Sequence, residues 1–143
     1  MLQRSRIVLQ RGWVQNAWYV VRSTRGNVRT LGPVQPRQVD PTRLVKACLV
    51  GAVVHSSWQW SSDETSSGPA IDALWETLQE ARGLGRPAGM SRVCAPMIRA
   101  RRVRDLVAWN DRAGQTREDV LALVDRTMAR LAEVESEAVH RSG

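Results

Sequence analysis

The chain has 143 residues, with 21 Lys and Arg against 14 Asp and Glu, and a formal net charge of +7. This length suits one domain with its own core, and no internal repeat, export signal or apolar run long enough for a membrane span is found. The two cysteines have no framework spacing, which favours a reduced, cytoplasmic protein over a disulfide-stapled secreted one.

The positive charge is concentrated in the first third of the chain. Residues 1–46 hold nine basic residues against Asp40 alone, a net of +8, whereas residues 47–143 hold twelve basic and thirteen acidic residues, a net of −1. All the basic residues except Lys46 are arginine, a bias that indicates a GC-rich genome. The asymmetry favours a polyanionic partner, which could be nucleic acid, an acidic protein or an anionic surface.

The residues before Asp40 predict a short helix and a β-hairpin. Residues 2–10 form the helix, which Gly12 ends. Two runs of β-forming residues, 17–23 and 28–31, flank Gly26-Asn27, and this arrangement is a hairpin signal.

The longest apolar run, which extends to Val54, predicts a central helix. Asp40 is suited to the N-cap and Pro41 to the first helical position. Apolar residues cover most of the predicted circumference, so we expect a buried helix. Gly51 is unfavourable inside a helix, and we therefore expect another element to approach closely there.

The second half of the chain predicts three more helices. A serine-rich segment, 55–67, is expected to be an exposed loop, followed by a helix at 69–83 that begins with Pro and ends with Gly. A third helix spans 96–109. Thr116 caps a fourth helix, which ends before a frayed tail at 136–143.

These elements predict an α+β fold: a mainly helical single domain of about four to five helices with an N-terminal β-hairpin. We expect the domain to span residues 1–140. A basic N-terminal helix and hairpin occupy 1–39, the helical core occupies 40–135, and the tail follows.

Three motifs resemble a known family when taken in order. They are Gly12-Trp13, then Cys48-Leu49-Val50-Gly51-Ala52, then Trp109-Asn110-Asp111 followed by Gly114-Gln115-Thr116. The chain resembles, from Leu2 to Leu131, a small domain-of-unknown-function family found in actinobacteria and their phages. It departs from that family in its Pro-rich connection and Ser-rich loop. The resemblance supports the fold and implies no reaction.

Neither cysteine predicts catalysis or metal binding. Cys48 and His55 lie seven residues apart on the predicted helix, which separates their backbones by about 10 Å, too far for a nucleophile and its base. A zinc site that uses these two residues with Cys94 and His140 lacks the short ligand spacings typical of such sites. We therefore predict no catalytic residue, no metal and no cofactor, and whether the protein is an enzyme stays open.

Trp109-Asn110-Asp111 has two interpretations. Asn and Asp suit the end of a helix, because their side chains satisfy nearby backbone groups. Alternatively, the motif lines a polar groove between the third and fourth predicted helices. An enzyme pocket near Cys48 or Asn110 is the weakest functional hypothesis.

Two basic clusters support the polyanion hypothesis, the first on the hairpin and the second on the third helix. Aromatic residues near the hairpin cluster could stack on bases. The alternative for the second cluster is a solvated face neutralised by Asp105, Glu76 or Glu80. No motif for sequence-specific nucleic-acid recognition accompanies either cluster. The candidate contacts are Arg22, Arg25 and Arg29 on the hairpin, Arg99, Arg101, Arg102 and Arg104 on the third helix, and Trp18 and Tyr19.

The leading hypothesis is a non-enzymatic binding protein with a basic surface that engages a polyanion, and nucleic acid is the expected partner. The alternative is a small phage or host regulatory module that binds an acidic protein. That module would use Trp58, Trp60 and the hairpin edge, although one of these two tryptophans is expected to fold back onto the core. The sequence indicates no oligomeric state.

Overall fold

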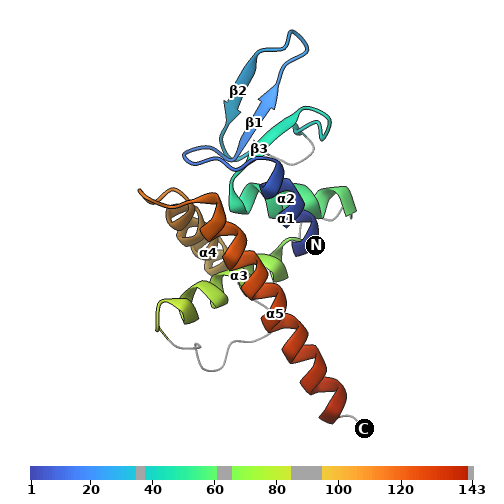
Figure 1. Cartoon of the computed structure of the whole chain (residues 1–143), viewed down its shortest axis with the longest axis vertical. Coiled ribbons are helices and arrows are strands. Elements are labelled where there is room, and N and C mark those ends of the chain that lie inside the picture. The colour runs from blue at the N-terminus through green and yellow to red at the C-terminus, as the bar shows by residue number, and fades with distance from the viewer. Residues whose placement is uncertain (35–37, 61–65, 85–94, 142–143) are drawn as a thin grey trace.

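A three-stranded sheet lies at one end of the molecule and five helices lie beneath it (Figure 1). The computed structural model describes residues 1–34, 38–60, 66–84 and 95–141, except for the side chains of Gln59 and Trp60. The predicted α+β class is confirmed. In chain order the elements are α1 (Leu2–Arg11), β1 (Tyr19–Arg22), β2 (Val28–Leu31), β3 (Leu44–Ala47), α2 (Leu49–Trp60), α3 (Gly68–Ala81), α4 (Pro96–Asn110) and α5 (Arg117–Arg141).

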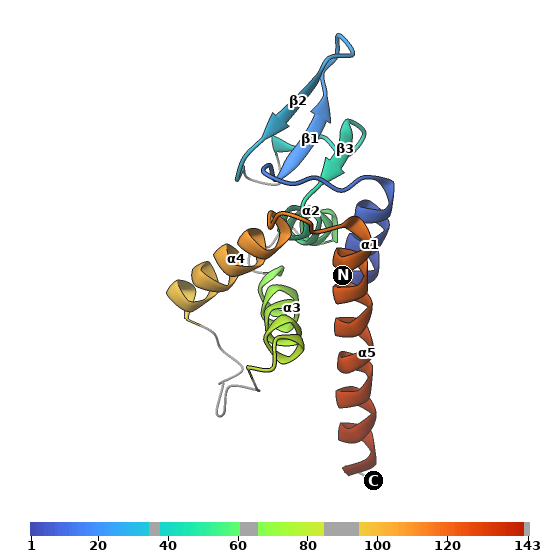
Figure 2. The same cartoon turned by 60° about the vertical axis from the view of Figure 1, so that its left-hand side comes forward.

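The predicted hairpin is confirmed as β1 and β2, which pair antiparallel with Arg22 opposite Val28. Its turn is closed by the N–H of Ser23, which donates to the carbonyl of Asn27 at 2.7 Å. Gly26 has φ +82°, a conformation that glycine adopts without the steric cost of a side chain. Both orientations show the hairpin projecting away from the helices (Figures 1 and 2).

The third strand corrects the prediction that a helix begins at Asp40. β3 pairs antiparallel with the other edge of β1, and α2 begins only at Leu49. Asp40 instead begins a β-turn, in which its carbonyl accepts from the N–H of Arg43 at 3.0 Å. Its Oδ1 also accepts from the N–H of Thr42 at 2.9 Å. Asp-Pro suits the first positions of a β-turn as well as those of a helix, and strand pairing decides between them.

The central helix α2 lies beneath the sheet and forms the middle of the core. Residues 49–53 are buried, and a Cβ added to Gly51 would lie 2.6 Å from the backbone oxygen of Trp18. The expected close approach at this glycine is thus confirmed. α2 continues to Trp60 and buries residues 55–57, so the prediction that an exposed loop begins at 55 is wrong. The Ser57 hydroxyl donates to the carbonyl of Val54 at 2.8 Å, which satisfies it inside the helix.

The helices α1, α3 and α4 contact α2, and α5 packs outside them. α1 packs against α2 and α5, while α3 packs against α4 and α5. The predicted end of α3 is confirmed, because Gly83 follows it with φ +72°. The cap of α5 is also confirmed: the N–H of Thr116 donates to Asp119 Oδ2 at 3.0 Å, and the N–H of Asp119 donates back to Thr116 Oγ at 3.2 Å.

The C-terminal helix is longer than predicted. α5 continues to Arg141 through residues expected to form a frayed tail. An ion pair of 3.1 Å between Arg141 and Glu137 joins successive turns there. Within the described ranges, no helix is both long enough and apolar enough to cross a membrane.

Candidate functional site

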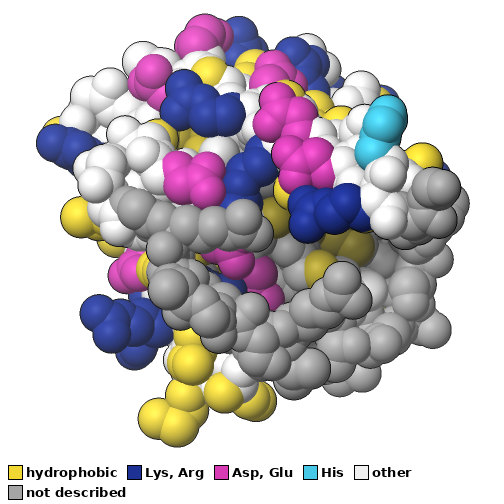
Figure 3. Space-filling view, turned by 90° about the horizontal axis from the view of Figure 1, so that it is seen from below, with side chains coloured by type: hydrophobic (Ala, Val, Ile, Leu, Met, Phe, Trp, Pro, Cys, Tyr) yellow, Lys and Arg dark blue, Asp and Glu magenta, His cyan; other side chains and the backbone are white. Residues whose placement is uncertain are grey.

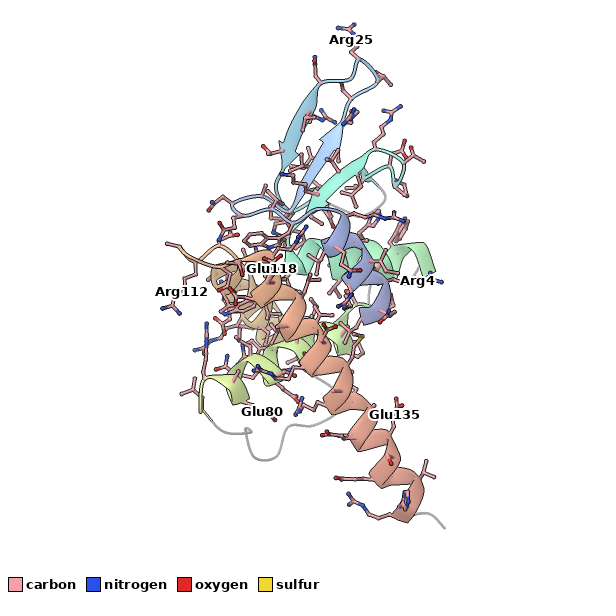
Figure 4. The ribbon with its side chains drawn as sticks, viewed as in Figure 1. Arg4, Arg25, Glu80, Arg112, Glu118 and Glu135 are labelled. Carbon is pink, nitrogen blue, oxygen red and sulfur yellow. The ribbon has the colours of Figure 1, made fainter. Side chains whose placement is uncertain are left out.

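The hairpin carries three exposed arginines, Arg22, Arg25 and Arg29. Arg25 lies at the tip of the hairpin and points away from the body of the molecule (Figure 4). Among the described residues, none of the three has an ion-pair partner. Their charge is therefore free to act on a ligand in solution.

The strand β3 adds Lys46 to this basic surface. Lys46 is exposed and lies opposite Val20 of β1. Because side chains alternate between the faces of a sheet, Lys46 shares the face of Val20 and Arg22, whereas Arg29 lies opposite Val21 on the other face. Sequence reasoning missed this neighbour because it assigned Lys46 to a helix, although the β-turn residues before the strand offered a signal. A cavity of about 350 Å³ between the ends of β1 and β3 is lined partly by Arg22 and Arg43.

The arginine cluster on α4 divides into an inner and an outer pair. Arg99 and Arg102 each lie 2.8 Å from a carboxylate oxygen of Asp72 on α3, and Arg102 is only 2% exposed. Arg101 and Arg104 are exposed. Residues three apart share a helix face, so the face of α4 that packs on α3 buries Arg102 and half-buries Arg99. The prediction that Arg102 contacts a polyanion is wrong, because α3 covers it.

The acids that were expected to neutralise this cluster bind other residues instead. Glu76 and Glu80 both pair with Arg130 of α5 at 3.0 Å. Asp105 accepts from the indole N–H of Trp75 at 2.9 Å. Seen from below, the described part of the helical end shows basic and acidic side chains intermixed (Figure 3). This face contrasts with the hairpin, whose three arginines form no ion pair with any acid in the described ranges.

The described aromatic candidates are buried or half-buried. Tyr19 is fully buried, and burial raises the pKa of its hydroxyl above the ordinary value. The prediction that Tyr19 stacks on bases is therefore wrong. Trp18 is half-buried and packs on the core, and Trp58 is half-buried on α2. The side chain of Trp60 lies outside the described residues.

The fully buried Asn110 joins three distant parts of the chain. Its Oδ1 accepts from the indole N–H of Trp13 at 2.8 Å and from the N–H of Leu49 at 3.1 Å. Its Nδ2 donates to the carbonyl of Val14 at 3.1 Å and to Asp111 Oδ1 at 2.8 Å. The amide oxygen thus accepts two hydrogen bonds and the amide nitrogen donates two, which is the full capacity of an amide.

Asp111 and Gln15 extend this polar centre. Asp111 Oδ1 also accepts from the N–H of Asn16 at 2.9 Å. The amide of Gln15 donates to the backbone carbonyls of Asn110 and Arg112 at 3.0 and 2.9 Å. The end of α4 is therefore fastened to the segment after α1 and to the first turn of α2. The motif thus has structural contacts of a kind that the turn-and-cap interpretation did not include, because Asn110 and Asp111 bind groups 61 to 97 residues away.

The three motifs meet at this polar centre, and the comparison with family models covers all of them. The model of a family of unknown function, DUF6197, matches residues 1–130. The chain belongs to this family. The DUF6197 match runs from α1 into α5, so it includes the sheet, the hairpin and the Asn110 contacts. No curated protein and no solved structure matched the chain.

The thiol of Cys48 is buried and protonated. Cys48 is 1% exposed, and its Sγ accepts from the N–H of Gly51 at 3.3 Å. Burial raises the pKa of this thiol to about 11, which opposes nucleophilic chemistry near neutral pH. His55 is also buried, and burial lowers its pKa. Cys94 lies outside the described residues, and the described part of the chain contains no group of three His, Cys, Asp or Glu placed to hold a metal.

The burial of Cys48 leads to a testable prediction. In a Cys94→Ser background, an aromatic disulfide reagent at pH 8 is expected to leave the folded protein unmodified and to label it fully in urea.

The folded thiol keeps its proton to about pH 11, whereas an ordinary thiol loses it near 9.0. Stability from this group is therefore complete below pH 9 and is lost as the pH rises toward 11. Cys48→Ala should reduce that loss in urea titrations, and rapid native labelling would contradict the assignment.

Proposed function

We propose that this protein is a non-enzymatic binding protein that engages nucleic acid by inserting its basic hairpin, with Arg22 and Lys46 on one face of the sheet, Arg29 on the other face and Arg25 at the tip. The observation that carries the proposal is the set of three hairpin arginines, exposed and without ion-pair partners in the described chain. Neutralising phosphates releases condensed counterions, which favours binding of such a surface to a polynucleotide.

Double-stranded nucleic acid suits this surface better than single-stranded nucleic acid does. A two-stranded ribbon can enter the major groove, which is about 12 Å wide in B-DNA. Arginine presents planar paired donors that match phosphate oxygens. Single-strand binding usually needs exposed aromatic rings, and Tyr19 is buried. The exposed Arg101 and Arg104 of α4 are proposed as secondary contacts, whereas Arg99 and Arg102 are committed to Asp72.

The proposal includes a cytoplasmic location, where nucleic acid is accessible, and an origin in actinobacteria or their phages, which the arginine bias favours. The competing proposal is an acidic protein partner, with Trp58 and the hairpin edge as contacts. The measurement below separates the two classes of partner.

The test is a salt series of fluorescence-anisotropy titrations with random duplex DNA, single-stranded DNA and RNA. For the unmodified protein, log K is expected to fall linearly with log salt. Arg25→Glu with Arg29→Glu should weaken duplex binding by at least about tenfold and reduce the slope by about 2, one for each phosphate contact removed. Both side chains are exposed, so the thermal unfolding temperature should not change.

The matched control is Arg112→Glu with Arg126→Glu, which makes the same change in charge on the helical body. It should leave duplex affinity within about threefold, since long-range effects are screened at about 0.1 M salt. Equal losses in the two double variants would refute a hairpin interface. No binding at low salt, where electrostatic attraction is strongest, would refute the nucleic-acid proposal and favour a protein partner.

A further inference from the structure

A second basic site lies among the ends of three helices. A cavity of about 390 Å³ is formed by the C-terminal end of α3, the turn between α4 and α5, and the first turns of α5. Arg112, which extends outward from that turn, marks its place in Figure 4. Its polar and aromatic lining consists of Arg82, Arg112, Arg126, Trp109, Gln115 and Asp119.

The three arginines leave the cavity with an excess of positive charge. None of them forms an ion pair with any residue that the structure describes. The carboxylate of Asp119 is held in the α5 cap by the backbone N–H and the hydroxyl of Thr116, at 3.0 and 2.7 Å. All three arginines are exposed, so they are accessible to an anion in solution, which their shared positive charge attracts.

The helix dipole explains the positions of only two of the three arginines. Arg82 and Arg112 follow the C-terminal ends of α3 and α4, where positive charge offsets the helix dipole. Arg126 lies in the interior of α5, away from either end of that helix, and no dipole accounts for it. Its position beside the other two is the feature that indicates a ligand.

The size and the lining define the class of ligand. The cavity volume lies within the range of about 300–1,000 Å³ that is usual for small-molecule sites. The half-buried Trp109 offers an aromatic surface, and Gln115 offers an amide that can donate and accept. We propose that this cavity binds a mononucleotide, with its phosphates on the arginines and its base against Trp109. The site is separate from the hairpin surface and does not depend on nucleic-acid binding there.

The test is isothermal titration calorimetry of the full chain with adenosine diphosphate and, separately, with inorganic pyrophosphate. Both probes are expected to bind, with adenosine diphosphate at least about fivefold tighter because a stacked base adds about 1–3 kcal/mol. Arg112→Glu with Arg126→Glu should weaken both probes at least about tenfold. Arg25→Glu with Arg29→Glu is the matched control and should leave both affinities within about twofold.

Trp109→Leu separates the base contact from the phosphate contacts. It should weaken adenosine diphosphate to the affinity of pyrophosphate and leave pyrophosphate binding unchanged, which also shows that the cavity is intact. Absence of heat with either probe at about 1 mM, or equal weakening by the hairpin variant, would overturn the proposal.

The phosphate could instead belong to the end of a nucleic-acid strand. Oligonucleotides with 5′-phosphate and 5′-hydroxyl ends are expected to bind equally in the presence of the hairpin double substitution. A preference for the phosphorylated end that disappears with Arg112→Glu and Arg126→Glu would overturn the mononucleotide assignment. Failure of the hairpin proposal leaves the calorimetric result unaffected, so the two proposals fail separately.

Discussion

Asn110→Ala is expected to lower the free energy of unfolding by about 3–5 kcal/mol, because it leaves several buried groups without partners. The indole N–H of Trp13, the N–H of Leu49 and the carbonyl of Val14 all depend on this side chain. Each buried polar group left unsatisfied costs about 1–3 kcal/mol, and partial access of water reduces the sum. The truncation also leaves a cavity at a position with no exposed surface.

Urea unfolding followed by tryptophan fluorescence and circular dichroism measures this loss. Gln10→Ala removes an exposed amide and should leave the unfolding midpoint almost unchanged. Asn110→Asp keeps the shape but turns an acceptor toward the Val14 carbonyl and the Asp111 carboxylate, so it should also be strongly destabilising. A normal midpoint for Asn110→Ala would contradict the structural interpretation of the motif and revive a ligand-binding one.

Asp72→Ala is expected to have a comparable effect, about 3–5 kcal/mol, because it removes a carboxylate that pairs with a buried guanidinium. Arg102 is 2% exposed, and Asp72 Oδ1 lies 2.8 Å from its Nη1. The guanidinium also lies 4.7 Å from the centre of the Trp75 ring. That cation–π contact cannot replace the carboxylate, since such contacts contribute about 0.5–2 kcal/mol.

The same unfolding measurement tests this prediction. Arg117→Ala breaks an ion pair of 3.1 Å between exposed side chains and should produce little change, because water screens such pairs. Adding Arg102→Met to Asp72→Ala should recover much of the loss, since an apolar side chain needs no counter-charge. If the double variant were as unstable as Asp72→Ala, packing rather than charge would explain the result.

Several elements could be predicted because their signals are local. Gly12 ends α1 where the prediction placed it, and Gly26-Asn27 lies in the hairpin turn. Gly83 and Thr116 likewise bound α3 and α5. Gly26 and Gly83 adopt a positive φ, and Thr116 satisfies free N–H groups at a helix start, so each acts through its own chemistry; Gly12 is extended and is needed because β3 approaches it closely.

The candidate site was only partly predictable. The charge and exposure of Arg25 and Arg29 follow from a polar turn with few acids nearby, and the structure places both on the surface. The sequence raised a polar groove at Trp109 between the third and fourth predicted helices, but it could not show that α3 also lines the cavity, because Arg82 and Arg126 lie 44 residues apart in the chain. Only the packing of α3 against α5 brings them together.

The sequence by itself determined the α+β class, the hairpin and the positions of most helices. The tertiary structure decided whether Leu44–Ala47 formed a helix or a strand, because the free edge of β1 supplies hydrogen bonds that no local pattern shows. It also decided that Arg102 is buried while Arg101 is exposed, and that Asn110 holds Trp13 and Leu49. These outcomes depend on partners far away in the chain, and a partner becomes known only when the elements have packed together.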